Sequence, residues 1–510
     1  MFKPTIGLEI HAELNTETKM FCSCKNEPDP NRPNLNTCPV CMGHPGTLPT
    51  INQEAVKKVI KTGMALGCSI PTHSKFDRKN YFYPDLPKGY QVSQYDEPLC
   101  ESGLLEVKIP IDCEQGQVPY LKTVRVRRVH LEEDTGRLLH PDGENYTLVD
   151  FNRAGVALME LVTEPDIRSA VEARRFAEEL QLILRYLNVS FADMEKGQMR
   201  VEANISLSEV KNGKLPENEK GMGIKVEVKN LNSFKAVERA IDYEIKRQAE
   251  ALEKGEKLVQ ETRGWDEVKG KTYSQREKEG AKDYRYFPEP DLPPMDHSEE
   301  FLSKIKSSIP ELPAQKRQRL AMEYGLGEVE AEAFVQNKDL SCYFEKTVSE
   351  LSQWVDETNG TAKVGPEELL KLSKLCVNYL LTDIQGLLSG ESIASPEFLI
   401  TPENFAELIC LIYQGKISSK IAKTVLEEMY DTGADPSQVI ESKGLSQISN
   451  QSEIEDIIKK VIAENPKPVE DYKQGKEASF QFLVGKIMAA SRGKANPEMA
   501  RQFLESALKP

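Results

Sequence analysis

The chain lacks the long apolar runs that mark membrane proteins. No stretch approaches the roughly 18 consecutive apolar residues of a membrane-spanning helix. Glu9 and His11 interrupt the first hydrophobic stretch, where a signal peptide would have its apolar core. We therefore expect a soluble, cytoplasmic protein with no membrane partner. The chain also lacks a Walker motif and the G-x-G-x-x-G fingerprint, which excludes nucleotide sites of the P-loop and Rossmann types.

An excess of basic residues is missing as well. The chain has 66 lysines and arginines against 81 acidic residues, a net charge of −15. This balance argues against a surface devoted to nucleic acid but allows local basic patches. One patch lies at residues 471–510, which hold seven basic and four acidic side chains, densest in GKIMAASRGKANP at 485–497. It suits phosphate contacts to RNA, although solvated helices often carry as much charge.

The ten cysteines do not form a disulfide framework, because six of them are scattered through unrelated contexts. The other four form two close pairs, Cys22-Ser-Cys24 and Cys38-Pro-Val-Cys41. This spacing can place four thiolates around Zn²⁺ as a closed, structural site, with His44 as a spare ligand. The alternative is a set of free or redox-active cysteines.

The composition predicts an α+β protein with three parts. Residues 1–293 alternate like strands and are rich in turns, and helical patterns follow in residues 294–402 and in a separate tail, residues 403–510. Within the first part, Ser169 and Glu172 form an S-x-x-E capping box ahead of apolar residues at helical spacing. They predict an amphipathic helix that packs on the sheet.

The segment IGLEIHAEL, residues 6–14, reads as a strand with two unlike faces. One face is apolar, and the other carries Glu9, His11 and Glu13 about 7 Å apart along the strand. That polar stripe either faces water, as in an ordinary half-buried strand, or lines a site that takes a cation.

Further acids lie in strand-like segments. They are Glu132, Glu133 and Asp134 in VHLEEDTGR, Glu160 in ALMELVTEPD and Glu227 in KVEVKN. Mg²⁺ takes oxygen ligands and is usually held together with substrate phosphates. Acids that converge with His11 would therefore suit an ATP-dependent site, whereas each acid taken singly also fits a solvated face or a surface ion pair.

Cations and aromatic side chains interleave in KFDRKNYFYPDLPKGYQVSQ, residues 75–94. Cations can neutralise phosphate charge in phosphoryl transfer, and aromatic rings can stack on bases. The competing interpretation is a packed loop whose lysines extend their charged ends to solvent.

Together, IGLEIHAEL, KFDRKNYFYPDLPKGYQ, VHLEEDTGR, DFNRAGVALMELVTEPDIRS, EANIS, VEVKNLNSF, DYRYFPEPD and FLVGKIMAASRGKANP resemble the B subunit of the glutamyl-tRNA(Gln)/aspartyl-tRNA(Asn) amidotransferase. The resemblance covers essentially the whole chain in order. It implies a mixed-sheet cradle domain with the catalytic site, then a helical domain and a helical tail that binds tRNA.

The resemblance also implies the reaction. Such an enzyme phosphorylates the side-chain carboxylate of Glu on tRNA(Gln), or of Asp on tRNA(Asn), with ATP and Mg²⁺, and ammonia then displaces the phosphate. This chain has no Ser-Ser-Lys amidase set and no evident Cys-His glutaminase pair. Ammonia is therefore expected from a glutaminase A subunit, with a small C subunit as a further partner.

The resemblance assigns roles to residues that match its motifs. His11 and Glu133 are the first choices as Mg²⁺ ligands, supported by Glu9, Glu160 and Glu227. Lys79 is the expected cation at the transferring phosphate, and Tyr81 lines the pocket. We expect Arg78, Lys79 and Lys88 to contact the nucleotide, and Glu133 to be essential for catalysis. The tetracysteine zinc site rests on its spacing, since only some family members have these cysteines.

Two other functions remain open from the sequence. One is a zinc-stabilised RNA-binding or assembly protein without catalysis, which leaves the acids and His11 unexplained. The other is an ATP-dependent ligase for a free small acid, which would turn over without tRNA.

Overall fold

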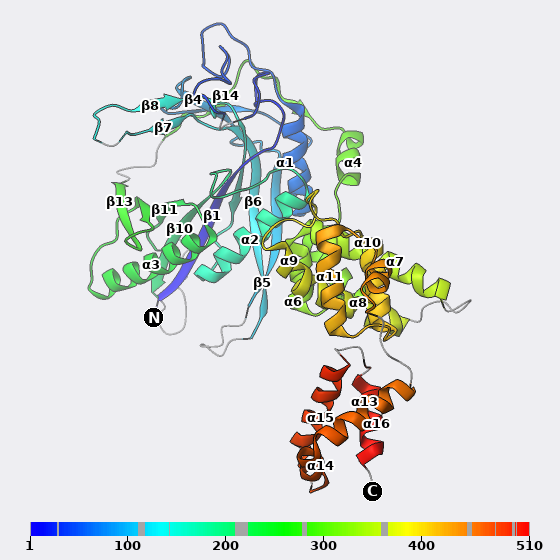
Figure 1. The fold of residues 1–510 in the computed structure, drawn as a ribbon. Coiled ribbons are helices and arrows are strands. Elements are labelled where there is room, and N and C mark those ends of the chain that lie inside the picture. The colour runs from blue at the N-terminus through cyan, green and yellow to red at the C-terminus, as the bar shows by residue number, and fades with distance from the viewer. Residues whose placement is uncertain are drawn as a thin grey trace. The chain divides into compact units, whose positions relative to one another are not determined.

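The computed structural model describes residues 2–27, 30–110, 118–141, 143–209, 223–277, 283–358, 366–445, 451–474, 476–491, 495 and 497–508. The chain divides into two compact units, Met1–Pro313 and Ala314–Pro510. The first unit carries the sheets and the second is helical (Figure 1). The predicted α+β class is confirmed at this level, as a mixed-sheet region followed by a mainly helical part.

Eight strands of the described chain form one sheet in the order β13-β12-β11-β10-β1-β9-β6-β5. The strands are β1 (Phe2–Glu13), β5 (Cys100–Ile109), β6 (Tyr120–Glu133), β9 (Ala157–Thr163), β10 (Met199–Glu209), β11 (Val226–Leu231), β12 (Glu261–Asp266) and β13 (Lys271–Glu277). Neighbours are antiparallel except β11 and β12, which are parallel. Because β1 lies between β10 and β9, its side chains meet those of both neighbours.

The strand predicted at IGLEIHAEL is confirmed within β1. Its apolar side chains, Ile6, Leu8 and Ile10, are buried in the same core as helices α2 (Ala170–Tyr186) and α3 (Phe234–Glu253). Because successive side chains of a strand point to opposite faces, Glu9, His11 and Glu13 face the other side. That polar face carries the candidate site.

The serine cap predicted for α2 is confirmed, but the glutamate of the predicted capping box bonds the residue before the cap. The hydroxyl of Ser169 accepts a hydrogen bond from the Glu172 backbone N–H at 3.2 Å, and the Glu172 carboxylate accepts one from the Arg168 N–H at 2.8 Å. Helix α3 has the same serine cap, since Ser233 accepts from the Ala236 N–H at 3.0 Å. These caps satisfy backbone donors that have no partner within the helix.

Smaller elements surround the sheet. They are the three-stranded sheet β14 (Phe287–Pro288), β3 (Asp77–Asn80), β4 (Tyr90–Ser93), the pairs β15 (Met295–Asp296) with β2 (His73–Ser74) and β7 (Arg137–Leu139) with β8 (Leu148–Asp150), and helices α1 (Gln53–Ala65) and α4 (Glu299–Ser307). Strand β4 packs against β6. The basic, aromatic segment at residues 75–94 is thereby placed beside the large sheet.

Helices make up the second unit. They are α5 (Pro313–Tyr324), α6 (Glu328–Gln336), α7 (Lys338–Thr358), α8 (Pro366–Tyr379), the π-helix η1 (Leu380–Ile384), α9 (Gln385–Leu388), α10 (Pro402–Tyr413), α11 (Ser419–Thr432), α12 (Pro436–Ser442), α13 (Gln451–Glu464), α14 (Pro466–Lys473), α15 (Glu477–Ala490) and α16 (Pro497–Leu508). Helix α10 packs against α7 and α8. Helices α13–α16 have a hydrophobic core of their own, which includes Ile454, Leu483 and Leu504.

The expected domain limits can be placed on these elements. The limit at residue 293 precedes α4, whose Ile305 belongs to the core of the sheet unit. The limit at residue 402 coincides with the start of α10. No helix among the described residues has the length and apolarity needed to span a membrane. Of the predicted basic patch, Arg492, Lys494 and Lys509 lie outside the described residues.

Candidate functional site

Three strands bring imidazoles and carboxylates together on the polar face of the sheet. Glu160 of β9 pairs in register with His11 of β1 on one side and with His130 of β6 on the other. Its carboxylate lies 3.4 Å from His11 Nε2 and 3.2 Å from His130 Nε2. Glu132, two residues after His130 on β6, places an oxygen 3.5 Å from His11 Nε2. Ligand atoms of His11, Glu132 and Glu160 all lie within 4.8 Å of one another.

The histidines and carboxylates of this group shift one another's pKa values. Burial acts to lower the pKa of His11, but Glu160 and Glu132 outweigh burial and raise it to about 9. Burial conversely acts to raise the pKa of Glu160, yet His130 and His11 hold that pKa well below the usual value. Glu160 is therefore an anion at neutral pH, and a divalent cation could replace the His11 proton between the carboxylates.

Lys79 of β3 reaches the same group from the small sheet. Its Nζ lies 3.8 Å from Glu132 and 5.5 Å from the centre of the Tyr284 ring. Burial acts to lower the pKa of Lys79, but Glu132 and Glu160 raise it well above the usual value. The side chain thus remains a cation beside the candidate metal ligands. Ser93 of β4 holds the Glu132 carboxylate with a 3.1 Å hydrogen bond.

A second acidic group continues along the same face. Glu9 of β1, Glu202 of β10 and Glu227 of β11 offer oxygens that lie within 4.8 Å of one another. Lys229 neutralises part of this charge, with its Nζ 2.7 Å from Glu202 and 3.5 Å from Glu227. Asn204 donates to Glu9 at 2.8 Å, whereas its buried Oδ1 has no hydrogen-bond partner among the described residues.

Glu13, at the far end of the stripe on β1, is buried beside charged residues of its own. Its neighbours are Asp134 and Arg200, and Arg200 lies 2.5 Å from Asp134. Burial and the Asp134 charge raise the pKa of Glu13 to about 8. The stripe seen in the sequence therefore divides among three acidic clusters on one face.

Glu133 occupies a different position from Glu132. Its carboxylate pairs with Lys88 and accepts a hydrogen bond from the Val92 backbone N–H at 2.9 Å. Alternation along β6 turns Glu133 away from the face that carries Glu132. The structure therefore brings His11 and Glu160 together with Glu132, and places Glu133 with Lys88.

Arg78 and Tyr81 of the basic, aromatic segment contact side chains from residues 284–289. Arg78 donates to both oxygens of Glu289 at 2.7 Å and stacks on Tyr90 at 4.3 Å. Tyr81 makes an edge contact with Tyr284, with 6.1 Å between ring centres, and burial raises its pKa. Strand β14, which follows Tyr284, pairs with β3 and joins this segment to the DYRYFPEPD motif.

The four expected cysteines converge. Sulfur atoms of Cys22, Cys24, Cys38 and Cys41 all lie within 4.8 Å of one another, and the sulfurs of Cys38 and Cys41 are 3.9 Å apart. The Cys38 backbone N–H donates to Cys41 Sγ at 3.1 Å. This arrangement can hold a tetrahedral metal, in which neighbouring sulfurs lie about 3.8 Å apart for a Zn–S bond of about 2.3 Å.

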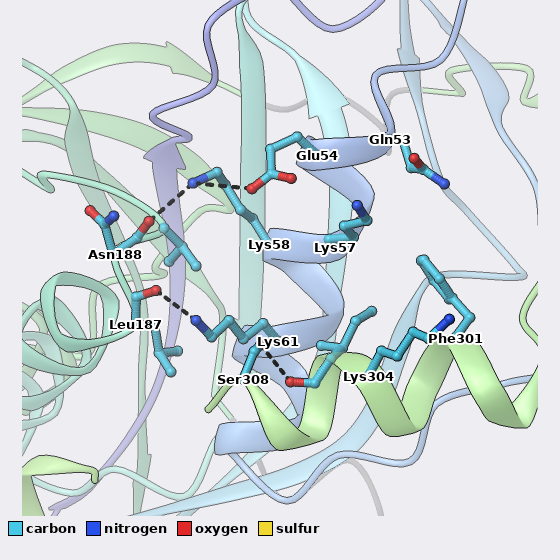
Figure 2. A pocket seen from close by; sticks show the side chains of 12 residues that line it. Gln53, Glu54, Lys57, Lys58, Lys61, Leu187, Asn188, Phe301, Lys304 and Ser308 are labelled. Carbon is cyan, nitrogen blue, oxygen red and sulfur yellow. Dashed lines mark hydrogen bonds and ion pairs between the residues drawn. The ribbon is translucent and has the colours of Figure 1, made fainter. Parts of the chain in front are cut away.

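A lysine-lined hollow of about 500 Å³ lies between α1, α4 and the residues after α2 (Figure 2). Lys58 donates to the Asn188 carbonyl at 3.0 Å, and Lys61 donates to the Leu187 carbonyl at 3.1 Å. Cations that bond the last carbonyls of a helix stabilise its C-terminus. Lys58 and Lys61 therefore fasten α1 to the end of α2.

Sequence reasoning assigned no role to several residues near these groups. His130 and Glu202 enter through cross-strand register, which requires knowing that β6 pairs with β9 and β1 with β10. The spacing of His130 and Glu132, two residues apart on one strand, was the available signal for His130. Tyr284 lies within the DYRYFPEPD motif, and nothing in its sequence context pointed to Lys79.

Comparison with known proteins places the whole chain. The model of the GatB/GatE catalytic domain matches residues 4–303, and the model of the GatB domain matches residues 366–508. The chain belongs to the GatB family. It is 46% identical over 508 residues to the B subunit of the aspartyl/glutamyl-tRNA(Asn/Gln) amidotransferase of Persephonella marina, covering 100% of both chains.

Other GatB relatives agree. The B subunits from Thermotoga maritima and Clostridium beijerinckii, which bear the same name, are each 46% identical, and 99% of each chain is covered. Both carboxylate groups and the cysteine cluster lie within the residues matched by the GatB/GatE catalytic model. Helices α8–α16 lie within the residues matched by the GatB domain. The full-length agreement confirms the resemblance inferred from the motifs.

Proposed function

We propose that this chain is the subunit of a tRNA-dependent amidotransferase that converts Glu-tRNA(Gln), Asp-tRNA(Asn) or both into the amidated products. The γ-phosphoryl group of ATP passes to the side-chain carboxylate, which gives an acyl phosphate and ADP. Ammonia then attacks the acyl carbon, phosphate leaves, and the nitrogen loses a proton. The observation that carries this proposal is the convergence of His11, Glu132 and Glu160 beside the buried cation of Lys79.

Mg²⁺ fits the donor atoms on this face. The Glu9, Glu202 and Glu227 group offers only oxygens, and the unpartnered Oδ1 of Asn204 beside it is a further oxygen. The group of His11, Glu132 and Glu160 adds one imidazole to two carboxylates. When bound, Mg²⁺ would neutralise phosphate charge. Glu132 then takes the ligand role that the sequence analysis gave to Glu133.

Lys79, on the small sheet, would support phosphoryl transfer from the side opposite the carboxylates of the large sheet. Its charge is held by Glu132 and Glu160, so the ammonium is fixed before a phosphate arrives, and fixed charges stabilise developing charge most effectively. Tyr81 and Tyr284, whose rings contact each other, would line the site on the side of Lys79. Arg78 and Lys88, expected at the nucleotide, remain candidates for that contact through rearrangement of their pairs with Glu289 and Glu133.

A structural Zn²⁺ completes the proposed cofactors. Four sulfur ligands leave no open coordination position, so Cys22, Cys24, Cys38 and Cys41 would hold their loop together without taking part in the reaction. Such a metal contributes on the order of 10 kcal/mol to local folding. The purified chain is expected to contain about one zinc.

Partners follow from the proposed reaction. The chain carries no recognised glutaminase set, so a glutaminase A subunit would supply ammonia and a small C subunit would complete the complex. Helices α13–α16 would contact the tRNA together with the mixed-sheet cradle, through the basic side chains of residues 471–510.

The test supplies the purified chain with Glu-tRNA(Gln), ATP, Mg²⁺ and an ammonium salt, and measures Gln-tRNA(Gln). The native chain is expected to form product and His11→Ala is not. His140→Ala is the matched control, because His140 is exposed and bonds only Thr147 among the described residues.

If the chain is inactive alone, the assay is repeated with the A and C subunits and with Asp-tRNA(Asn). Failure of the complete complex on both tRNAs would reject catalysis in favour of an RNA-binding or assembly role. Amide formation on free glutamate without tRNA would instead indicate a small-acid ligase.

A further inference from the structure

Lys19 is a fully buried lysine, with 0% of its surface exposed. Its Nζ donates to the Ala154 carbonyl at 2.8 Å, to the Phe151 carbonyl at 3.3 Å and to Cys41 Sγ at 3.9 Å. Within the described part of the chain, no carboxylate forms an ion pair with it. Burial of a charge is costly unless an opposite charge compensates it. The environment of Lys19 therefore needs an anion, and the sulfur of Cys41 is the group placed to provide one.

A tetracysteine zinc site would supply that anion. Four thiolates around one Zn²⁺ carry a net charge of −2, and this charge would sit beside Cys41, a buried residue. Outer groups that donate hydrogen bonds to metal ligands orient the ligands and tune metal affinity. The Cys38 N–H donates to Cys41 Sγ, and the Lys19 amine is placed to donate to the same sulfur.

We propose that Lys19 is the charge-compensating positioning residue of the cysteine metal site. Its ammonium would donate to the metal-bound Cys41 thiolate and offset half of the net negative charge. The inference rests on the zinc site proposed above and is independent of the amidotransferase activity. Cys41 would then be the most strongly stabilised of the four ligands.

Lys19 also joins the metal site to the loop that leads into β9. The two carbonyls that it bonds belong to residues 151–154, and the next residue, Gly155, packs against Cys41 closely enough that an added Cβ would lie 3.3 Å from Cys41 Cβ. The Met20 N–H donates to the Gly155 carbonyl at 2.8 Å, and the Gly155 N–H donates to the Asp134 carbonyl at 2.9 Å. Loss of the Lys19 charge should therefore loosen this loop as well as the metal.

The test compares Lys19→Met and Lys19→Arg with the native full-length chain. Zinc release into a chromophoric chelator is measured, together with the rise in melting temperature that zinc produces. Lys19→Met should release zinc at least about tenfold faster, as for other changes in groups that bond metal ligands. Zinc should also raise the melting temperature of Lys19→Met by less than it raises that of the native chain. Lys19→Arg keeps the charge and should remain closer to the native rate.

Lys58→Met is the matched control. Lys58 is also buried, and it donates to the Asn188 carbonyl and lies 3.7 Å from the Glu54 carboxylate (Figure 2). It also donates to Asn15 Oδ1, but it bonds no cysteine among the described residues. A general cost of removing a buried lysine would appear in both methionine variants as lower stability. Only Lys19→Met should change the zinc release rate and the stabilisation by zinc.

A measurement on the native chain covers the case in which Lys19→Met fails to fold. The ¹⁵N resonance of the Lys19 ammonium should shift when zinc is removed, while the Lys58 resonance should stay in place. Two results would overturn the role of Lys19 alone. One is that Lys19→Met binds zinc and releases it at the native rate, and the other is that the Lys19 ¹⁵N resonance does not shift when zinc is removed. Absence of zinc from the native chain would overturn the zinc site and this inference together.

Discussion

Adjacent carboxylates on one strand can have unrelated roles, and Glu132 and Glu133 give a direct test. Glu132 lies between His11 and Lys79, whereas Glu133 is held by Lys88 and the Val92 N–H. Glu132→Gln should therefore raise the Mg²⁺ concentration needed for tRNA-dependent ATP turnover by at least about tenfold, since a ligand charge is lost. A Mg²⁺ titration of the rate measures this effect.

Glu133→Gln is the isosteric control for that titration. It should leave the Mg²⁺ requirement closer to native, because the Glu133 carboxylate lies outside the group of His11, Glu132 and Glu160. If Glu133→Gln changes the Mg²⁺ requirement and Glu132→Gln does not, the ligand role returns to Glu133, as the sequence motif first indicated.

The sequence carried part of this site at the residue level. Residue type and alternation were enough to mark His11 and Glu160 as a candidate pair, and the register of β1 with β9 brings them together. The choice within the 132–134 run depended on which residue faces the sheet's polar side, and that requires the partner strand. Lys19 had no signal at all, because burial of one lysine among polar loop residues depends on tertiary packing.

At the scale of elements, the serine cap of α2 should contribute measurably to stability. Ser169 accepts from the Glu172 N–H, so Ser169→Ala leaves that donor without its partner. We expect the free energy of unfolding of the sheet unit to fall by about 1 kcal/mol. Ser169→Asp keeps an acceptor at the cap and should remain close to native in a urea titration followed by a probe in this unit.

Equal stabilities for Ser169→Ala and Ser169→Asp would mean that the cap adds nothing beyond the packing of the helix.

The elements that the sequence located well were those with a strong local pattern. The alternation of β1 and the capped, apolar face of α2 are of this kind. Helix α4 was assigned to the helical part by composition, yet its Ile305 joins the sheet core, and only tertiary contacts reveal that.

On the scale of the whole molecule, we expect truncation before α13 and truncation before α10 to have different effects. Helices α13–α16 form their own core, so a chain that ends at residue 445 removes this group as a whole. The truncated chain should keep its zinc content and its Mg²⁺-dependent ATP chemistry. Its affinity for tRNA should fall by about tenfold or more, and that affinity should depend less on salt because basic phosphate contacts are lost.

A chain that ends at residue 402 is the informative comparison. It removes α10, whose Phe405, Leu408 and Ile409 are fully buried and which packs against α7 and α8. Loss of several buried apolar side chains, each worth about 1.5–3 kcal/mol, should destabilise the helices that remain. Calorimetry and tRNA titrations at two salt concentrations would separate these outcomes. If truncation at 445 leaves tRNA affinity and its salt dependence unchanged, the tRNA contacts lie elsewhere, and the basic residues at 471–510 belong to a solvated surface.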